Sequence, residues 1–311
     1  MTRFPLSRTL FGLSSVLLCG AVVAQDPNST PAPSDSGFLT GLRGFEHFHE
    51  PLGQPIYFET PFNDTGVRAL FLYHTFGDNA FVQGGHVAVY AAQVRVALSE
   101  RWQFIATKDG YSDISTGLLG NDAGWNDYAG GLKYVLVADR KQDLVVSTGI
   151  RYMTETGSRL YGFLNGNTDE WSPFVSFGKG YDNLHLLGNA TLRLPSDSKK
   201  GNIVGDWGVH LDYSVNPQDR AVFAPLVEIH GIHYLDDADP SGPTAGLPFG
   251  GIDYTNLGSS PNHHFVSWAG IGARVEIDHK LEFGACYEFA LTNPDDDLMK
   301  DRVTVDFILR W

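Results

Sequence analysis

Ionisable side chains recur at every second position in several stretches of this sequence. In the stretch GDWGVHLDYSV, Asp206, His210 and Asp212 alternate with Trp, Val, Leu and Tyr residues. Alternate side chains of an extended strand point to the same side, so the two carboxylates and the imidazole would share one face. Groups of this kind can line a water-filled path and interact with ions or polar solutes that pass along it.

The residues expected to line such a path are ionisable and lie on the polar side of their strands. They are Arg68, Arg95, Lys133, Arg151, His185, Arg193, His210, Asp212, Glu228, His230, Arg274, Glu276, Glu282, Glu288, Asp306 and Arg310. Both charge signs are present, so ion selectivity stays open, because selectivity depends on the field at the narrowest ring. The alternative is that these charges pair with one another across the interior and fill it.

Metal binding and hydrolysis are two other activities that histidine and serine residues could support. His47 and His49 in EHFHE would share a face, and His263 and His264 adjoin, but no histidine spacing resembles a zinc-site pattern. Ser267 could point outward, as the serine of a membrane-surface hydrolase must, but the sequence has no G-x-S-x-G motif. We therefore expect no metal site, no cofactor and no catalytic residues.

Two acidic groups fall between the alternating stretches. Asp236, Asp237 and Asp239 form one, residues 295–297 form the other, and both offer oxygen atoms of the kind that calcium and magnesium prefer. Neither matches the EF-hand spacing, so we expect solvated charge. The first group begins the 235–264 connection, the longest one, which either folds inward as a constriction, presents a binding surface or forms a solvated flap.

The polar positions must be carried by strands, and twelve segments show the required alternation. They are 66–76, 86–98, 102–109, 125–138, 142–155, 171–179, 183–194, 206–215, 222–234, 265–278, 281–291 and 302–311. Most are about 9–14 residues long, which is longer than ordinary globular strands and close to the length that crosses a bilayer at a tilt. After residue 24 no apolar stretch reaches about 18 residues, which excludes ordinary transmembrane helices.

The expected connections between these segments alternate in length. The links at 99–101, 139–141, 180–182, 216–221 and 279–280 are short, and those at 77–85, 110–124, 156–170, 195–205, 235–264 and 292–301 are long. Tight turns at one end and long loops at the other are typical of outer-membrane barrels, whereas a soluble sandwich has no reason for this asymmetry. We therefore predict an all-β fold, a closed antiparallel transmembrane β-barrel of about 12 strands over residues 66–311.

The stretch DRVTVDFILRW carries an apolar side to its last residue. Val303, Val305, Phe307, Leu309 and Trp311 fall on one side of an extended strand, and Thr, Asp, Ile and Arg residues fall on the other. A soluble domain more often ends in a frayed polar segment. We therefore expect these five side chains to face lipid.

The first 65 residues divide into three parts. Residues 1–24 carry two arginines, an apolar run and small residues before Gln25, which is the layout of a cleaved signal peptide. Residues 25–36 are rich in Pro, Ser and Asp and predict a flexible linker. Residues 37–65 hold several phenylalanines without a clean period, and predict a short irregular periplasmic arm that plugs the barrel or docks outside its base.

The twelve alternating segments, the leader and the final VTVDFILRW resemble Gram-negative outer-membrane β-barrel proteins, whose last strand commonly ends in Phe or Trp. This resemblance covers nearly all of residues 66–311, and it implies that the last strand is an insertion signal read by the barrel-insertion machinery. The stretches PIYFETPF and RWQFIATKDGY are similar to outer-membrane transporters of the phenol-degradation type. That similarity implies passive transport and identifies no substrate, because fold does not specify function.

We therefore expect a porin or channel-like transporter for passive passage of small polar or amphipathic solutes. Its place would be the outer membrane of a Gram-negative bacterium, after export by a cleaved signal peptide. Its partners would be outer-membrane lipid, lipopolysaccharide, the barrel-insertion machinery and small solutes, but not nucleic acid, because the net charge is −14. The alternatives are a non-conducting structural or surface-interaction barrel and an outer-membrane hydrolase.

Overall fold

The computed structural model describes residues 37–162, 168–244, 246–247, 250–251, 253, 255–258, 265–296 and 298–311. The expected signal peptide at 1–24 and linker at 25–36 lie outside the described residues, as does part of the 235–264 connection. In the described ranges no helix has the length and apolarity that crossing a bilayer requires.

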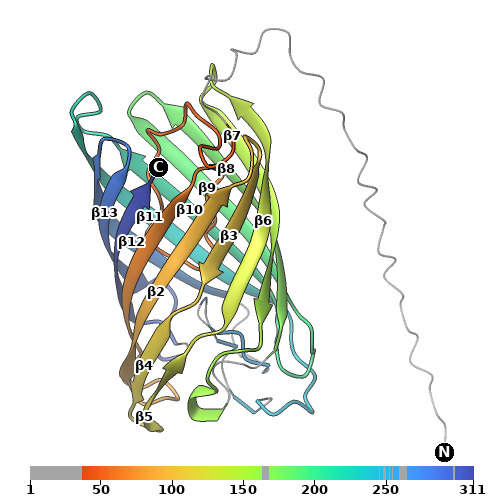
Figure 1. Ribbon diagram of the computed structural model, residues 1–311. Coiled ribbons are helices and arrows are strands. Elements are labelled where there is room, and N and C mark those ends of the chain that lie inside the picture. Colours follow the sequence, from red (N-terminus) through yellow and green to blue (C-terminus); the bar gives the residue numbers. More distant parts are fainter. Residues whose placement is uncertain are drawn as a thin grey trace, which may run out of the picture. The chain divides into compact units, whose positions relative to one another are not determined.

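The described chain contains fourteen strands and one short 3-10 turn, η1 (Leu160–Gly162). The strands are β1 (Gly66–Thr75), β2 (Gly85–Ala97), β3 (Trp102–Lys108), β4 (Tyr111–Thr116), β5 (Gly120–Trp125), β6 (Tyr128–Asp139), β7 (Leu144–Thr154), β8 (Glu170–Tyr181), β9 (Leu184–Pro195), β10 (Ile203–Tyr213), β11 (Ala221–Asp236), β12 (Phe265–Ile277), β13 (Leu281–Ala290) and β14 (Asp301–Arg310). Neighbouring strands pair antiparallel, and β1 pairs with both β14 and β2, which closes the sheet on itself (Figure 1).

The barrel has twelve strand positions, because two positions are each divided into two strands. β3 pairs with residues 94–97 of β2, and β4 pairs with residues 85–90 of the same strand, so β4 continues the position that β3 begins. On the other side β6 pairs with β3 and β5 pairs with β4. The predicted all-β, closed, antiparallel barrel of twelve strands is thus confirmed.

Residues 110–124, predicted as a long loop, instead form the hairpin of β4 and β5 (Figure 1). The break between β3 and β4 lies at Asp109 and Gly110. Gly110 has a φ of 95°, and a Cβ there would lie 2.2 Å from the Tyr90 carbonyl oxygen, so glycine is required. Asp109 Oδ1 accepts a hydrogen bond from Ala92 N at 2.9 Å. The polar sequence of this hairpin resembles a loop, and its strand character comes from pairing with β2.

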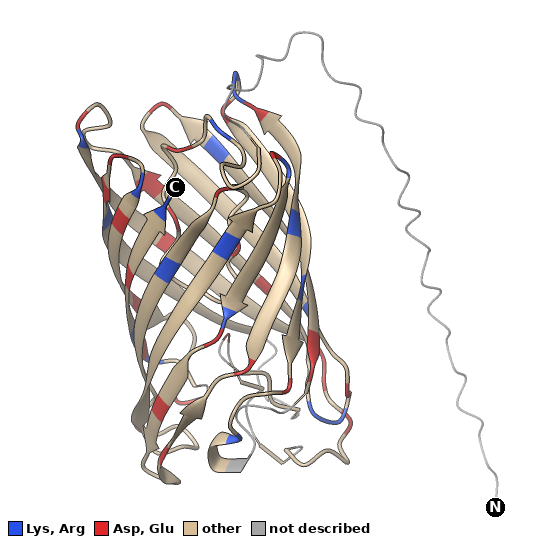
Figure 2. Cartoon of the chain, in the orientation of Figure 1, with Lys and Arg blue, Asp and Glu red and all other residues tan. Residues whose placement is uncertain are grey.

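The two faces of the barrel wall have opposite character. Along β11, the side chains of Phe223, Val227 and Ile229 are 45%, 49% and 47% exposed. The side chains of Glu228 and His230, which alternate with them, are buried. Most charged residues within the strands have buried side chains, and the others lie mainly in the turns; Figure 2 marks the charged positions along the ribbon. A wall that exposes apolar side chains and buries ionisable ones reverses the pattern of a soluble protein and suits a lipid surround.

Strand β14 follows the same alternation. Val303, Val305, Phe307, Leu309 and Trp311 lie on its outer side, where all but the partly covered Phe307 are exposed. The inner side carries buried polar residues. Contact of these five side chains with lipid and their part in insertion stay predictions.

The connections at the two ends of the barrel differ in length. The turns at 98–101, 140–143, 182–183, 214–220 and 278–280 lie at one end, the short-turn end, together with the C-terminus (top of Figure 1). The connections at 76–84, 155–169, 196–202, 237–264 and 291–300 lie at the other end, the long-loop end, together with the β4–β5 hairpin.

Candidate functional site

Residues 37–65, called the lumen segment below, run inside the barrel. At the short-turn end the Asn63 side chain donates hydrogen bonds to the carbonyl oxygens of Ser99 and Glu100 at 2.8 and 2.7 Å. Leu42 N donates to Asn63 O at 2.7 Å, which brings the two ends of the segment together. The chain between them extends into the barrel and returns (Figure 1).

Apolar side chains explain why the lumen segment lies inside. A buried cluster joins aromatic rings of the segment to aliphatic side chains of β6, β7 and β9, and consists of Leu42, Phe45, Phe48, Phe58, Phe62, Val135, Val145 and Leu187. Fully burying one such side chain is worth about 1.5–3 kcal/mol. Four of the five phenylalanines of this segment therefore share a place in the interior, whereas Phe38 is exposed.

The tip of the lumen segment binds a carboxylate of the wall through its backbone. The amides of Leu52 and Gly53 donate to the Glu228 carboxylate at 2.9 and 2.5 Å. A Cβ on Gly53 would lie 2.4 Å from His230 Nε2 and 2.5 Å from Glu228 Oε2, so this close approach requires glycine. Gln54 adds a side-chain hydrogen bond to Asp206 at 3.0 Å.

Inward-facing cations of the wall bind the backbone carbonyls of the lumen segment. Arg68 donates to Pro51 O at 2.8 Å, Arg151 to Ile56 O at 2.6 Å and Lys133 to Thr60 O at 2.8 Å. Each of these donors is buried. An irregular segment inside a barrel must find partners for its backbone groups, and these contacts supply them.

Glu59 is the main anionic contact of the lumen segment. Its carboxylate lies 3.0 Å from Arg95, 2.9 Å from Lys133 and 3.8 Å from Arg151, and its side chain is 1% exposed. Three cations from β2, β6 and β7 therefore surround one buried negative charge. A buried ion is stable only when such partners replace its water.

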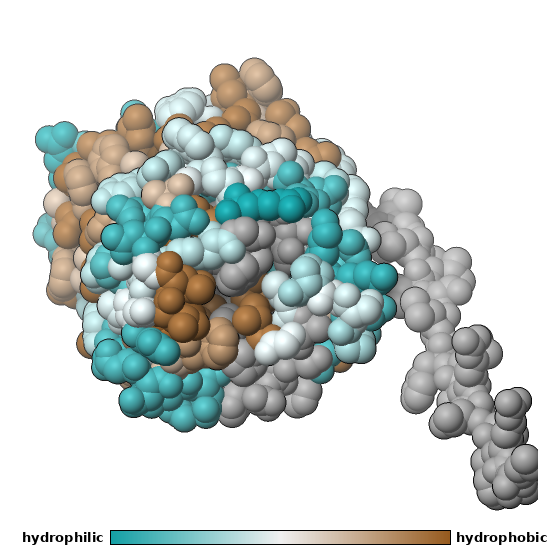
Figure 3. Space-filling model, turned by 90° about the horizontal axis from the view of Figure 1, so that it is seen from below, coloured by the Kyte–Doolittle hydropathy of each residue, from teal (hydrophilic) through white to brown (hydrophobic). Residues whose placement is uncertain are grey.

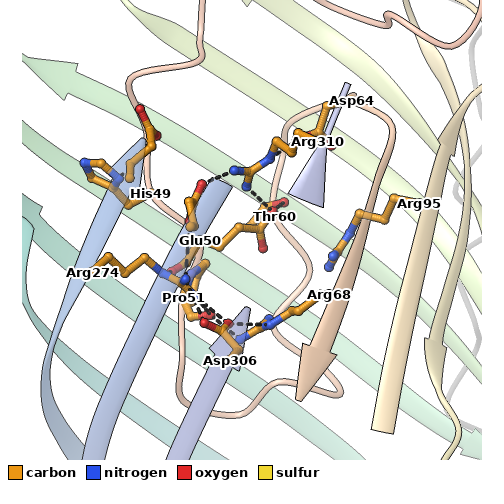
Figure 4. Close-up of polar contacts among 12 residues, drawn as sticks. His49, Glu50, Pro51, Thr60, Asp64, Arg68, Arg95, Arg274, Asp306 and Arg310 are labelled. Carbon is orange, nitrogen blue, oxygen red and sulfur yellow. Dashed lines mark hydrogen bonds and ion pairs between the residues drawn. The ribbon is translucent and has the colours of Figure 1, made fainter. Parts of the chain in front are cut away.

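A second ionic cluster lies next to the first, around Glu50 and wall residues of β1, β12 and β14 (Figure 4). Arg310 contacts Glu50 at 3.4 Å, and Asp306 lies 2.6 Å from Arg68 and 2.7 Å from Arg274. Arg274 also donates to the backbone carbonyl of Glu50. The wall residues thus bind each other and the segment.

Imidazoles and carboxylates form a third cluster between β9, β10 and β11. His210 lies 2.7 Å from Glu228 and 3.0 Å from Asp212, and Asp212 lies 2.7 Å from His185. All four side chains are buried. The chain of hydrogen bonds continues to the tip of the lumen segment, because Glu228 also accepts the two backbone amides there.

The sixteen ionisable residues expected to line a water-filled path all point inward, and fifteen of them are buried. The sixteenth, Arg310, has a side chain that is 15% exposed at the short-turn end. The structure brings eleven of them together in the three clusters described above. The other five, Arg193, His230, Glu276, Glu282 and Glu288, also have an ionisable partner within 3.3 Å. Their role in lining a path for solutes stays a prediction.

Towards the long-loop end the inner face becomes apolar, which the expectation of a uniformly polar interior missed. A cavity of about 60 Å³, called the apolar chamber below, lies against β1, β2 and β4. Its apolar lining includes Leu70, Leu72, Phe76, Val82, Val87, Val89, Ile114 and Leu298. Polar groups lie at its margin, among them Gln93, Lys108 and Arg302. Pro55 and Ile56 of the lumen segment also line it.

The surface of the long-loop end has a matching pattern. Figure 3 views this end and shows apolar residues within a rim of hydrophilic ones. Phe81, Leu119 and Leu247, which belong to the connections at this end, line the chamber. The chamber therefore lies between the long-loop end and the tip of the lumen segment.

Solved structures with a similar fold include outer-membrane channels. The fold is similar to that of the COG4313 outer membrane channel from Pseudomonas putida F1, with a TM-score of 0.57 and 11% sequence identity over 85% of this chain and 100% of that chain. The chain folds as an outer-membrane β-barrel. The barrel is also similar to the NanC porin, with a TM-score of 0.46 and 10% identity over 79% of this chain and 100% of that one. No family model and no curated protein matches the chain.

Sequence reasoning missed several residues that hold this outer-membrane barrel together. They are Arg302, Asp253 and Glu170. Arg302 lies 2.7 Å from the expected Glu288 and 2.7 Å from Asp253, and Glu170 lies 3.1 Å from the expected Arg193. Alternation could have found Arg302, which is in phase with the inward residues of β14. Asp253 belongs to the long 235–264 connection, where no local pattern predicts its position.

Two clusters bring three ligand-type atoms within 4.8 Å of one another, and His49 of the lumen segment belongs to both. Its partners are His185 and Asp212 in one cluster and Glu276 and Glu282 in the other. Asp212 is hydrogen bonded to His185 at 2.7 Å, and Glu282 forms an ion pair with an arginine. The absence of a metal site stays a prediction.

Ser267, the residue considered for a hydrolase, is buried at 7% exposure. Its backbone carbonyl accepts hydrogen bonds from Leu291 N at 2.8 Å and Thr292 N at 3.3 Å. Ser267 is in phase with the exposed Phe265 and Ile271, as expected for an outward position, but it is buried, so it is not accessible on the outer surface.

Proposed function

We propose that this barrel is a porin or channel-like transporter that lets small amphipathic solutes cross the outer membrane passively. The observation that carries the proposal is the apolar chamber inside the barrel wall. An apolar body placed there would gain about 25 cal/mol per Å² of surface removed from water, and the marginal polar groups would orient a polar end. The proposal narrows the expected polar or amphipathic solutes to the amphipathic ones.

We further propose that the lumen segment acts as a plug at the periplasmic mouth. Its buried phenylalanines and the ion pairs of Glu59 support this role, because together they occupy the interior at the short-turn end. Solute movement would then require the segment to shift. The contacts that must break are the ion pairs and the hydrogen bonds to its backbone.

The cellular setting is also part of the proposal. Residues 1–24 would direct export, and β14 would be recognised by the barrel-insertion machinery of a Gram-negative bacterium. The exposed apolar outer face, which includes Val305 and Leu309, supports contact with outer-membrane lipid and lipopolysaccharide. We propose no enzymatic activity.

Planar-bilayer recording of the purified full chain, with a variant that lacks residues 37–65, tests the channel proposal. Discrete conductance steps that become larger or more frequent in the variant are the expected result. Liposome-swelling rates should then be higher for amphipathic than for fully polar solutes of the same size. Silence of both correctly folded proteins would refute a channel.

A non-conducting structural barrel is the second candidate. It is favoured by the pairing of most interior charges, for example Glu59 with Arg95 and Lys133. A filled interior needs no solute, so this candidate predicts no conductance and no solute binding in either protein. Its job would then be carried by the exposed acidic loops.

A further inference from the structure

Lys108 differs from the other buried cations inside the barrel. Arg68, Arg95, Lys133 and Arg302 each have a carboxylate oxygen within 3.0 Å. Lys108 is only 6% exposed, and among the described residues no carboxylate oxygen lies within 4.0 Å of its ammonium group. Its Nζ instead lies 2.9 Å from Met153 Sδ, a weak acceptor.

The acids closest to Lys108 are bound to other groups. Asp127 and Glu170 line a small cavity beside Lys108. Asp127 Oδ1 accepts the backbone amides of residues 156 and 157 at 3.2 and 2.8 Å. Glu170 forms an ion pair with Arg193 at 3.1 Å. The ammonium of Lys108 therefore lacks a direct counter-charge in an interior where buried ions need one.

The position of Lys108 at the end of β3 places this charge at a margin of the apolar chamber. Lys108 lines both the chamber and the small cavity that contains Asp127, so its side chain lies where the two meet. Neighbouring lining is aliphatic, with Leu70, Leu72 and Val89 on β1 and β2. The lining also contains the carboxyl groups of Asp109 and Asp253, which are bound to Ala92 N and to Arg302. A largely aliphatic cavity with a cation at its edge that has no carboxylate in direct contact is complementary to a small anion with an apolar tail.

We propose that the chamber binds small aliphatic monocarboxylates, with the carboxylate paired to Lys108 and the tail against the β1–β2 wall. A charge-assisted hydrogen bond to the ammonium would supply the missing counter-charge. A cavity of about 60 Å³ has room for roughly four to six waters, whose combined volume suits a chain of a few carbons. This inference rests on the proposed function, because it names the solute class that the channel would favour.

Binding of pentanoate and of its neutral isostere pentanamide to the folded full chain in detergent micelles tests the proposal. Isothermal titration calorimetry at neutral pH should show pentanoate binding at least roughly tenfold more tightly, as expected for a hydrogen bond to a buried charge. K108M should abolish this preference, and K108R should retain most of it. Lys199→Met removes an exposed charge at the same end and should leave the preference unchanged.

Equal affinity of the wild type for the two probes would overturn the proposal, and so would an unchanged preference in K108M. If K108M fails to fold, K108Q and the comparison of the two probes on the wild type decide the question. The assay needs no transport. If the barrel binds pentanoate preferentially but never conducts, the channel proposal is refuted and the carboxylate site stands. If the barrel conducts but shows no preference for the carboxylate, the carboxylate site is refuted and the channel proposal stands.

Discussion

Replacing Glu59 by glutamine tests whether ion pairs hold the lumen segment inside the barrel. The side chain is 1% exposed, and its carboxylate lies 3.0 Å from Arg95, 2.9 Å from Lys133 and 3.8 Å from Arg151. Glutamine keeps the size of the side chain and one acceptor oxygen. It removes the negative charge that these three buried cations share.

The magnitude follows from the burial of these charges. Removing one partner of a buried ion pair costs about 3–5 kcal/mol, because the other charge is left uncompensated. Three cations lose the same partner, but the costs do not add, since displacement of the segment would let water reach them. At the lower figure of about 3 kcal/mol, the equilibrium between bound and displaced segment shifts by roughly 100-fold.

Single-channel recording in planar bilayers measures this shift as the ratio of open to closed times. We expect Glu59→Gln to raise that ratio by at least roughly 100-fold over the wild type. Glu46→Gln is the matched control, because Glu46 belongs to the same segment but is about one-third exposed and lies 3.9 Å from Arg43. Such an exposed pair contributes about 0–1 kcal/mol.

An open fraction in Glu59→Gln that equals the wild type would refute the reasoning, provided that the variant is folded. An equal increase in Glu46→Gln would also refute it, because the effect would then not depend on burial. If neither protein conducts while both are folded, the channel proposal fails instead. Heat-modifiable migration on gels provides the test of folding.

The remaining predictions concern the tip, an interior ion pair and the chamber. Gly53→Ala would place a Cβ 2.4 Å from the buried imidazole of His230, so urea titration in micelles should show a free energy of unfolding lower by about 1–3 kcal/mol. Gly246→Ala is the control, because its Cβ would have no atom within 4 Å and the free energy of unfolding should not change. Arg302→Leu leaves Glu288 buried without its cation and should cost about 3–5 kcal/mol in the same titration; unchanged stability would argue against that pair. Leu72→Asp should slow liposome uptake of amphipathic solutes more than that of polar ones, and an equal effect on both would count against the chamber.

The alternation of side chains along each strand could be interpreted without a structure. Side chains of successive residues point to opposite faces, so Phe223 and Val227 were separable from Glu228 by position alone. The same rule placed the sixteen ionisable residues on the inner face. Twelve strand positions followed, because each strand is long enough to show the pattern.

This local rule does not predict which strands pair with one another. The β4–β5 hairpin has a polar sequence like that of a loop, and only its register with β2 shows that it continues the barrel. The inner face of β1 changes from Arg68 to Leu70 and Leu72 without any break in alternation. The apolar chamber forms because β2, which pairs with β1, places Val87 and Val89 beside these leucines. The sequence of β1 alone does not predict this neighbour.

The sequence by itself determined which residues face lipid and which face the interior, because that choice depends on a period of two within each strand. The tertiary structure alone decided what fills the interior. Glu59 meets Arg95, Lys133 and Arg151, which lie 36–92 residues away in the chain on three strands. Among the described residues, Lys108 has no carboxylate oxygen within 4.0 Å. Such partners are set by ring closure and register, which no local pattern encodes.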